Sequence, residues 1–212
     1  MQLTIAGVDG FMYPKSQRGE DVYFIDKLLE TIEYDKGVPI GTYKLIPLIE
    51  TTSAVMNVQE ICKASPRVIA IAYGSEDFVT DLEGIHDLDH KSLFTPRAMI
   101  AMGARATGVI PIDTVHVRVH DFEDLEKNLK TSKTLGFEGM LVLNPKEIPL
   151  VHQYYSPTDQ EVLDAKEMLI LSEKAKETGE GVAIMNGKFI GPPMIKAAEK
   201  VLLKKNLIER KK

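Results

Sequence analysis

The sequence predicts an α/β protein built on a parallel sheet or barrel. Apolar runs rich in β-branched residues alternate along the chain with stretches of helical periodicity. Two of these runs lead into an acid: residues 44–50 end in Glu50, and residues 68–73 are followed within a few positions by Asp77. Parallel strands joined by helices point their carboxyl ends to one face, so the two carboxylates are expected to be neighbours in space.

Five strands are predicted from the short apolar runs. They cover part of residues 7–15 and then residues 44–50, 68–73, 112–119 and 140–143. Apolar residues recur at helical spacing between them, which predicts helices over residues 20–31, 54–64, 96–106 and 122–135. The polar residues 74–91 are predicted to form a loop. This alternation of strands and helices predicts right-handed crossovers.

The composition changes near residue 156, and residues 154–212 are expected to form an arm on a main body of residues 1–153. Ser156, followed by a proline and by Asp159, is typical of a helix start with serine as the N-cap. This first helix of the arm is expected to run to about residue 178.

The rest of the arm is predicted to be a hairpin and a second helix. Asn186-Gly187 is the strongest signal for a type I′ turn, and Pro192 is typical of a helix start. A helix–hairpin–helix segment of this size cannot form much of a core by itself. It is therefore interpreted as a lid or arm that packs on the main body or on another subunit.

Composition limits the classes of protein to which the chain can belong. Its 212 residues carry a formal net charge of −5, which argues against nucleic acid as the main partner. The single Cys62 excludes an internal disulfide. No apolar run approaches the roughly 20 residues of a membrane span, and no charged-then-apolar leader opens the chain, so a cytoplasmic location without membrane contact is expected.

The strand-end acids Glu50 and Asp77 are the candidate metal ligands. Two carboxylates on rigid strand ends suit a hard divalent ion such as Mg²⁺, which takes one or two acids together with water and substrate oxygens. From the residues alone a second interpretation stays open, in which each acid is a loop or helix-cap residue. Thr51 and Thr52, which follow Glu50, are typical of caps.

Two other groups of polar residues lie near this region. Residues 86–90 have the sequence His-Asp-Leu-Asp-His, but their spacing does not place the side chains on one face of an element. They are therefore interpreted as a solvated loop and not as a metal site. Arg97 and Arg105 lie eight residues apart on one predicted helix, on roughly the same side, and are expected to form salt bridges.

Short motifs along nearly the whole chain occur in the order known from one enzyme family. They are Gly7-Val-Asp-Gly-Phe-Met-Tyr-Pro14-Lys15, Ile-Pro-Leu-Ile-Glu50-Thr, Tyr-Gly74-Ser-Glu-Asp77-Phe, Arg97, Pro-Ile-Asp113-Thr-Val, Asp121-Phe-Glu-Asp-Leu125, Gly136-Phe-Glu-Gly139, Asn144-Pro145, Tyr-Ser156-Pro157-Thr-Asp and Asn-Gly187-Lys-Phe-Ile with Pro193. On these motifs the chain resembles the family of the citrate lyase β subunit and malyl-CoA lyase.

The resemblance implies a magnesium-dependent (β/α)8 barrel of the phosphoenolpyruvate/pyruvate type. Members of the family cleave or form a carbon–carbon bond in a CoA thioester, so an acyl-CoA thioester and a keto acid are the implied substrates. Glu50 and Asp77 are the implied ligands of Mg²⁺. The arm is implied to be the lid over the CoA site, often that of an adjacent subunit, in a trimer or hexamer.

The resemblance also implies a set of substrate-binding positions, namely Gly74, Ser75, Glu76 and Pro145. The backbone amides that follow Gly74 are expected to help hold a substrate carboxylate, as successive N–H groups commonly do. Glu76 is in addition the candidate catalytic residue, because it stands beside the ligand Asp77 and can shape the site or orient water. The alternative for Glu76 is a solvated loop acid.

The chain departs from the family pattern in three respects. Around the last strand it has Gly139-Met140 and Leu143-Asn144-Pro145, where the family usually has Gly-Lys and Ile-His-Pro. A barrel of this kind takes roughly 250 residues, whereas the arm begins here at about residue 154, so the sequence corresponds to strands 4–8. A fragment, a displaced gene start and a second polypeptide that supplies the first three βα units all stay open as explanations. The lid motif of the family places an aspartate, a candidate catalytic base, where this chain has Gly191.

The function expected from the sequence is therefore that of a magnesium-dependent carbon–carbon lyase of the citryl-CoA or malyl-CoA type. One alternative is a non-catalytic relative that acts as a binding or assembly subunit, which Gly191 and the absent strands favour. Another is a pyruvate-type aldolase without CoA, which shares the acid pair but does not normally carry the arm. The expected protein partner is a second copy of the chain or a chain that supplies the missing strands.

Overall fold

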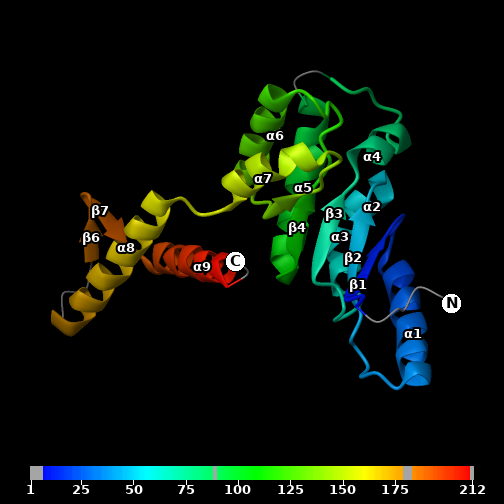
Figure 1. Ribbon diagram of the computed structural model, residues 1–212, viewed down its shortest axis with the longest axis horizontal. Helices are drawn as coiled ribbons and strands as arrows, with labels where there is room; N and C mark the ends of the chain where they lie inside the picture. Colours follow the sequence, from blue (N-terminus) through cyan, green and yellow to red (C-terminus); the bar gives the residue numbers. More distant parts are fainter. Residues whose placement is uncertain (1–6, 88–89, 179–182, 211–212) are drawn as a thin grey trace. The chain divides into compact units, whose positions relative to one another are not determined.

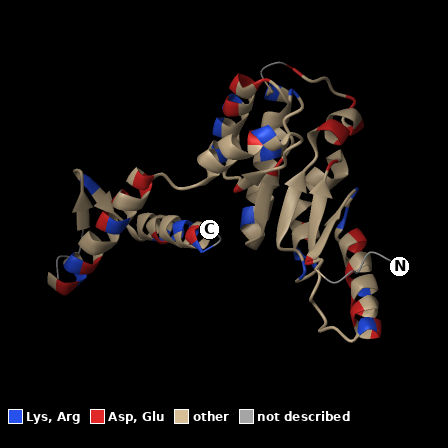
Figure 2. Cartoon of the chain, viewed as in Figure 1, with Lys and Arg blue, Asp and Glu red and all other residues tan. Residues whose placement is uncertain are grey.

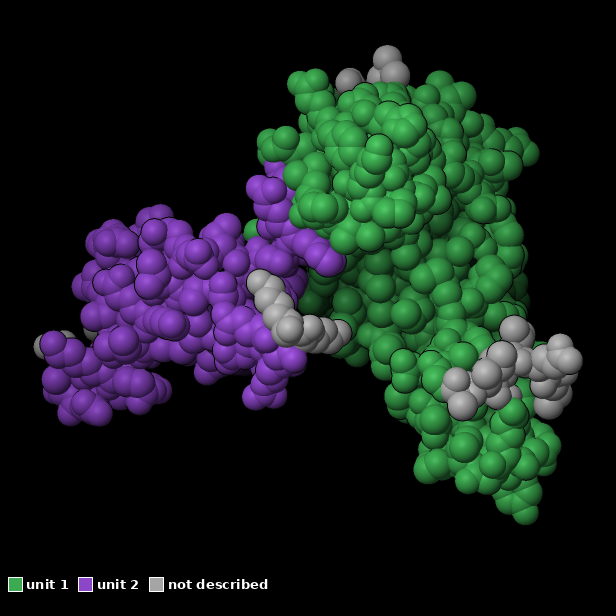
Figure 3. All heavy atoms as spheres, viewed as in Figure 1, with its two compact units in different colours: residues 1–151 green, residues 152–212 purple. Residues whose placement is uncertain are grey.

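The computed structural model describes residues 7–87, 90–178 and 183–210. The chain divides into two compact units, Met1–Val151 and His152–Lys212 (Figures 1 and 3). Among the described residues, no helix combines the length and the apolar character that crossing a bilayer requires.

The first unit is built on a parallel sheet of five strands in the order β1-β2-β3-β4-β5 (Figure 1). The strands are β1 Gly10–Tyr13, β2 Lys44–Ile49, β3 Ala70–Tyr73, β4 Ile110–Asp113 and β5 Gly139–Met140. Each strand pairs with the next one along the chain, as in a continuous βα winding. The predicted α/β class with parallel strands is therefore confirmed.

Helices connect the strands, and successive helices pack against one another, α1 on α3, α3 on α5 and α5 on α6 (Figure 1). Their bounds are α1 Gly19–Lys36, α2 Thr52–Met56, α3 Val58–Lys63, α4 Ser75–Asp81, α5 Lys91–Thr107, α6 Phe122–Leu135, the 3₁₀ turn η1 Pro145–Glu147 and α7 Ile148–Tyr155. The predicted bounds of α6 are confirmed, whereas the helix predicted over residues 54–64 is divided between α2 and α3.

Helix α4 was not predicted, because it lies in the polar segment that we expected to be a loop. Its seven residues are too few for a helical stripe to show. Glu76 and Asp77 lie in its first turn, where carboxylates interact favourably with the positive end of the helix dipole. The charge view marks α4 as an acidic element (Figure 2).

Strand β4 ends at Asp113, although residues 112–119 were predicted to be extended throughout. The carboxylate of Asp113 accepts a hydrogen bond from the backbone N–H of Thr114, 2.8 Å away, and bonds to the guanidinium of Arg97. These side-chain contacts turn the chain away from the sheet directly after the strand. The residues that follow therefore lie at the carboxyl end of the sheet instead of continuing the ladder.

The core of the first unit lies between the sheet and the helices. Every residue of β3 is buried, which fits a central strand of a parallel sheet that is covered on both faces. Helix α5 approaches α3 closely at Gly103, where a Cβ would stand 2.6 Å from Cγ1 of Val58. Glycine is required at this position because any side chain would separate the two helices.

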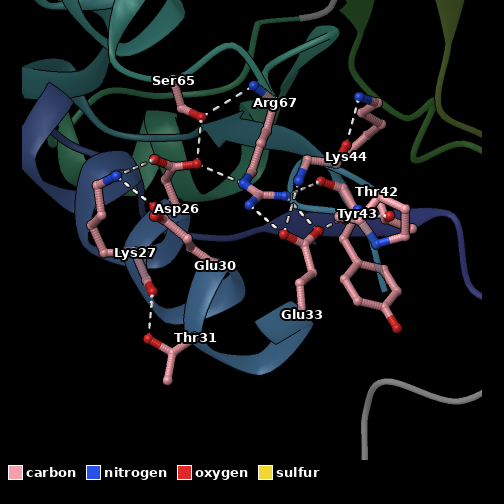
Figure 4. Close-up of polar contacts among 12 residues, drawn as sticks. Asp26, Lys27, Glu30, Thr31, Glu33, Thr42, Tyr43, Lys44, Ser65 and Arg67 are labelled. Carbon is pink, nitrogen blue, oxygen red and sulfur yellow. Dashed lines mark hydrogen bonds and ion pairs between the residues drawn. The ribbon is translucent and has the colours of Figure 1, made fainter. Parts of the chain in front are cut away.

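A buried ion network stabilises the opposite end of the sheet, where β2 and β3 begin (Figure 4). Arg67 is 2 % exposed, and it donates to Asp26 and to both carboxylate oxygens of Glu33, each at 2.6 Å. The backbone N–H groups of Tyr43 and Gly41 also donate to Glu33. Burial alone raises the pKa of Glu33, but these bonds outweigh it and lower the pKa to about 2.

The second unit consists of α8 Asp159–Thr178, the hairpin β6 Ala183–Met185 and β7 Lys188–Ile190, and α9 Pro192–Glu209. Asn186 and Gly187 have positive φ angles of 49° and 72°, as the type I′ turn requires. The predicted hairpin and last helix are confirmed. The cap of α8 differs from the prediction, because Thr158 and Glu161 form a reciprocal capping box two residues after Ser156.

Candidate active site

The structure places Glu50 and Asp77 at the carboxyl ends of neighbouring strands. Glu50 directly follows β2, and Asp77 lies in the first turn of α4, which directly follows β3 and Gly74. The two carboxylates differ in environment: the side chain of Glu50 is 4 % exposed and that of Asp77 is 55 % exposed. The carboxylate of Glu50 is thus fixed in the protein, whereas that of Asp77 faces solvent.

A single cation, the ammonium of Lys15, interacts with both carboxylates. It forms a short ion pair with Oδ1 of Asp77 and lies 4.0 Å from Oε1 of Glu50. The backbone N–H of Lys15 also donates to Oε1 of Glu50, at 2.7 Å. The bond to Asp77 raises the pKa of Lys15 above its ordinary value, against the opposing effect of desolvation. The two acids therefore converge on one position that accepts a positive charge.

Gly74 provides the room that the side chain of Glu50 needs. A Cβ at this position would lie 2.8 Å from Cβ and 3.1 Å from Oε2 of Glu50. The N–H of Gly74 donates to the carbonyl of Ile49, at 2.9 Å, which holds the two strand ends together. Gly74 therefore acts on the acid pair through packing.

Ser75 is buried, with 2 % exposure, and its polar groups are bound to Thr114. Its backbone N–H donates to Oγ1 of Thr114 at 3.1 Å, and the two hydroxyl groups are 2.8 Å apart. The N–H of Ser75, which was expected to help hold a substrate carboxylate, thus has a partner within the protein. Thr114 anchors the first residue of α4 and with it the turn that carries Asp77.

Helix capping at the start of α2 does not involve the acid pair. The hydroxyl of Thr51 accepts from the N–H of Ala54 at 3.1 Å, and the carboxylate of Asp81 accepts from the N–H and the hydroxyl of Thr52. The interpretation of Glu50 as a cap of this helix is therefore wrong, since Glu50 accepts instead from the backbone of Lys15.

A cavity of about 250 Å³ lies at the carboxyl ends of β3, β4 and β5, and its lining includes Glu76, the residue directly before Asp77, but neither Glu50 nor Asp77. Ser75, Glu76 and Thr114 line it together with His86, His90 and His116. Oε2 of Glu76 lies 3.3 Å from Nε2 of His86. Pro145 is exposed at the start of η1 and is not part of this lining. Of the expected substrate positions, Ser75 and Glu76 therefore line the cavity, whereas Gly74 and Pro145 do not.

The polar segment at residues 86–90 separates into individual roles, with residues 88 and 89 outside the described part of the chain. Asp87 caps the start of α5 through the N–H groups of Lys91 and Ser92, which lowers the pKa of Asp87. No group of three or more His, Cys, Asp or Glu side chains among the described residues is arranged to hold a metal ion. The interpretation of the whole segment as a solvated loop stays a prediction, because residues 88 and 89 lie outside the described part of the chain.

Sequence reasoning missed a polar cluster beneath the cavity, formed by His90, His116, Asp124 and Asn128. Nε2 of His90 and Nε2 of His116 lie 3.1 Å and 3.0 Å from the same Oδ2 of Asp124. Asp124 lies in the first turn of α6, and His116 follows β4, so no local spacing indicates the contact. The one member of this cluster that the sequence analysis singled out was His90, as part of the segment at residues 86–90.

The two arginines of α5 form ion pairs, as expected. Arg97 and Asp113 are 1 % and 0 % exposed at their side chains, and their short ion pair links α5 to the end of β4. Arg105 forms an exposed ion pair with Glu138. Both side chains are thus used within the fold.

The acid pair fits a hard divalent cation. Its donors are carboxylate oxygens, and the cation that they already bind, the Lys15 ammonium, marks their common position. Two protein carboxylates leave most positions of an octahedral ion to water and substrate oxygens, which is how Mg²⁺ is commonly bound. Glu50 and Asp77 are the residues that would hold the ion.

The parallel βα winding, together with the acid pair at the carboxyl ends of its strands, defines an α/β protein with a candidate site for a divalent cation. Residues 1–145 match the family described as HpcH/HpaI aldolase/citrate lyase, and the chain belongs to this family. The resemblance inferred from the motifs is thus confirmed.

Individual relatives carry the names citrate lyase and malyl-CoA lyase. The chain is 33% identical over 197 residues to citrate lyase subunit beta of Leuconostoc mesenteroides, which covers 93% of this chain and 65% of the relative. It is 30% identical over 220 residues to the L-malyl-CoA/beta-methylmalyl-CoA lyase of Cereibacter sphaeroides, with 95% and 68% covered. The chain therefore spans about two thirds of the length of the curated relatives that it matches.

Solved structures confirm the fold. A citrate lyase from Burkholderia xenovorans has a TM-score of 0.82 at 20% identity, over 95% of this chain and 64% of that chain. The protein CitE from Mycobacterium tuberculosis, in complex with magnesium, acetoacetate and coenzyme A, has a TM-score of 0.72 at 23% identity, over 93% and 68%. The chain thus has the TIM-barrel-like fold of the citrate lyase β subunits.

Proposed function

We propose that this chain belongs to a magnesium-dependent carbon–carbon lyase that cleaves a hydroxyacyl-CoA thioester to a keto acid and acetyl-CoA, or joins them. The convergence of Glu50 and Asp77 on one cation carries the proposal. The names of the relatives support the reaction class, and the magnesium, acetoacetate and coenzyme A in the CitE complex support the ligands.

In this proposal Glu50, Asp77 and Lys15 act together at the metal position. Glu50 and Asp77 hold Mg²⁺, which when bound polarises the oxygen of the keto or hydroxy acid. Glu50 is the fixed ligand because it is buried and accepts a backbone N–H, whereas Asp77 is exposed and adjusts its position. The ammonium of Lys15 exchanges its carboxylate contacts for the carboxylate of the substrate when the ion enters.

The cavity at the carboxyl ends of β3, β4 and β5 is proposed to hold the reacting part of the substrate. Ser75 and Glu76 line it and directly precede Asp77 in the sequence, which supports a bound acid that contacts both the metal and the polar cavity wall. Glu76 is proposed to orient water or substrate there. Pro145 is kept as a substrate-binding position only on the resemblance, since it lies outside the cavity lining.

The second unit, His152–Lys212, is proposed to act as the lid over the CoA site and as a subunit contact in a homo-oligomer in the cytoplasm. Its apolar side chains Leu163, Ile170, Phe189 and Leu203 are each more than half exposed, as in a surface that packs against a partner. The proposed assembly is a trimer or hexamer of this chain, or a complex with a second chain that supplies further barrel strands.

A non-catalytic binding or assembly subunit is the second candidate. One observation favours it: Gly191, the N-cap of α9, has no side chain to act as the base that the lid aspartate of the family would supply. A pyruvate-type aldolase without CoA shares the acid pair, but the presence of the arm argues against it.

Calorimetric titration of Mg²⁺ tests the proposal. The wild type is expected to bind Mg²⁺ more tightly with pyruvate or oxaloacetate present than alone, and E50Q/D77N is expected to lose this binding. E173Q/D159N removes two exposed acids of α8, whose side chains are 69% and 94% exposed, and is expected to bind like the wild type. A folded wild type that binds neither ligand would contradict the proposal. Binding without turnover of malyl-CoA or citryl-CoA would favour the non-catalytic candidate.

A further inference from the structure

Three of the five histidines of the chain line the cavity that Ser75 and Glu76, directly before Asp77 in the sequence, also line. One of them, His90, is held by the carboxylate of Asp124 on α6. Its Nε2 lies 3.2 Å and 3.1 Å from the two oxygens of Asp124 and 3.1 Å from Nδ2 of Asn128. The ring is 24 % exposed, so it is oriented by the protein and still accessible from the cavity.

A second, buried imidazole supports Asp124 from the other side. His116 is 3 % exposed and lies 3.0 Å from Oδ2 of Asp124 through Nε2, and 3.6 Å from Oε1 of Glu147 through Nδ1. The Nδ1 atom of His116 and Oε1 of Glu147 have no hydrogen-bond partner among the described residues. These two atoms face each other, so the buried imidazole of His116 lies between the carboxylates of Asp124 and Glu147.

Asp124 stays ionised in this environment. Burial raises its pKa, but hydrogen bonds from His116 and His90, helped by the charge of Arg118, outweigh burial and lower the pKa below its ordinary value. An ionised carboxylate bonded to one ring nitrogen fixes the tautomer of an imidazole and stabilises its cationic form. His90 thus has the support that a general acid–base group needs.

We propose that His90 is a general acid–base residue of this active site and that Asp124 and Asn128 are its positioning residues. This inference rests on the proposed lyase function and supplies the proton acceptor that Gly191 cannot provide. Because Nε2 faces Asp124, the proton is exchanged at Nδ1 of His90.

The chemistry balances without an oxidant or a further reactant. In cleavage, neutral His90 takes the proton of the substrate hydroxyl while the carbon–carbon bond breaks. The electron pair of that bond passes to the acyl-CoA fragment as its enolate, and the hydroxyl carbon becomes the carbonyl of the keto acid. The imidazolium then returns the proton to the α-carbon of the enolate, directly or through water, which yields acetyl-CoA and neutral His90.

The other two histidines of the cavity are less suited to this role. His116 also lines the cavity, but its side chain is 3 % exposed and both of its nitrogens face carboxylates, so it offers a substrate little access. His86 is 47 % exposed, and its carboxylate partner Glu76 is equally exposed at 48 %, so solvent competes for the contact. His90 alone combines access from the cavity with a buried carboxylate partner.

Exchange of the α-protons of acetyl-CoA into D₂O, followed by mass spectrometry with Mg²⁺ and pyruvate present, tests the assignment on the full chain. H90N keeps a residue that tolerates the left-handed backbone of position 90, where φ is 53°. It is expected to lower the exchange rate at least about 100-fold, in line with the usual contribution of a general base. H120N, at an exposed histidine outside the cavity, is expected to exchange like the wild type.

Two further variants separate catalysis from structure. H90G fits the same backbone and leaves space for free imidazole, which is expected to restore exchange in a concentration-dependent manner. D124N is expected to slow exchange by at least about tenfold and not to respond to imidazole, because the base remains but is no longer oriented.

Each outcome decides the inference. Loss of exchange in H90N with unchanged binding of Mg²⁺ and pyruvate, together with imidazole rescue of H90G, supports it. Exchange in H90N within about threefold of the wild type overturns it and leaves the lyase proposal intact. Loss of ligand binding in H90N, or a wild type that binds both ligands and shows no exchange, also overturns it. A wild type that binds neither ligand overturns the lyase proposal and this inference together.

Discussion

Replacing Arg67 by methionine is expected to destabilise the protein strongly, because it leaves two buried carboxylates without their counterion. Arg67 is 3 % exposed at its side chain, and its three nitrogens bond to Asp26, to both oxygens of Glu33 and to the carbonyl of Tyr43. Methionine fills a similar volume but donates none of these bonds. The deletion of one partner of a buried pair typically costs about 3–5 kcal/mol, because the remaining charge has no compensation.

The pKa of Glu33 gives an upper magnitude for the contribution of Arg67, because the N–H groups of Tyr43 and Gly41 also lower it. Its ordinary value of 4.5 is lowered to about 2 in the fold, which corresponds to about 3 kcal/mol of linked stability. A depressed acid contributes this stability above its unfolded pKa and loses it as pH falls through the folded pKa. We therefore expect the full effect at pH 7 and a loss of stability of the wild type as pH falls from about 4.5 toward 2. The difference in free energy of unfolding between R67M and the wild type is expected to become smaller over the same pH range.

Urea unfolding followed by circular dichroism at pH 7 and at acid pH measures both effects. R105M is the matched control, since Arg105 forms its ion pair with Glu138 at the surface, where each side chain is more than a third exposed. R105M is expected to cost less than about 1 kcal/mol. Similar free energies of unfolding for R67M and R105M, or a constant difference between R67M and the wild type from pH 7 to pH 3, would refute the reasoning.

Two other substitutions examine the acid pair. K15M removes the cation that competes with Mg²⁺ for Glu50 and Asp77, so calorimetry without keto acid is expected to show Mg²⁺ bound about two- to fivefold more tightly than by the wild type. K27M, the control, removes a lysine that pairs elsewhere and is expected to bind Mg²⁺ like the wild type. Weaker Mg²⁺ binding by K15M would contradict the competition. G74A forces a methyl group to within 2.8 Å of Cβ of Glu50 and is expected to weaken Mg²⁺ binding at least about tenfold. G139A, whose methyl meets nothing closer than 4.0 Å, is its control, and equal Mg²⁺ affinities of the two variants would exclude the steric role of Gly74.

The parallel strands and the acid pair were predictable because their signals are local. Glu50 terminates an apolar run and Asp77 follows the next, and the geometry of parallel strands brings such residues to one face. Helix α4 was missed because its seven residues, with only Phe78 and Val79 apolar, are too few to show a helical period. The role of Lys15 was missed because its two partners lie 35 and 62 residues away in sequence.

The sequence by itself determined the α/β class, the family and the order of the elements, since periodicity and motifs are properties of short segments. Only the tertiary structure decided which polar groups meet. His90, Asp124 and His116 come from three separate segments, and each is unremarkable in its own context. Their association depends on how α5, α6 and the end of β4 pack together. A pairwise contact between distant residues is a consequence of that packing, and no property of a single segment encodes it.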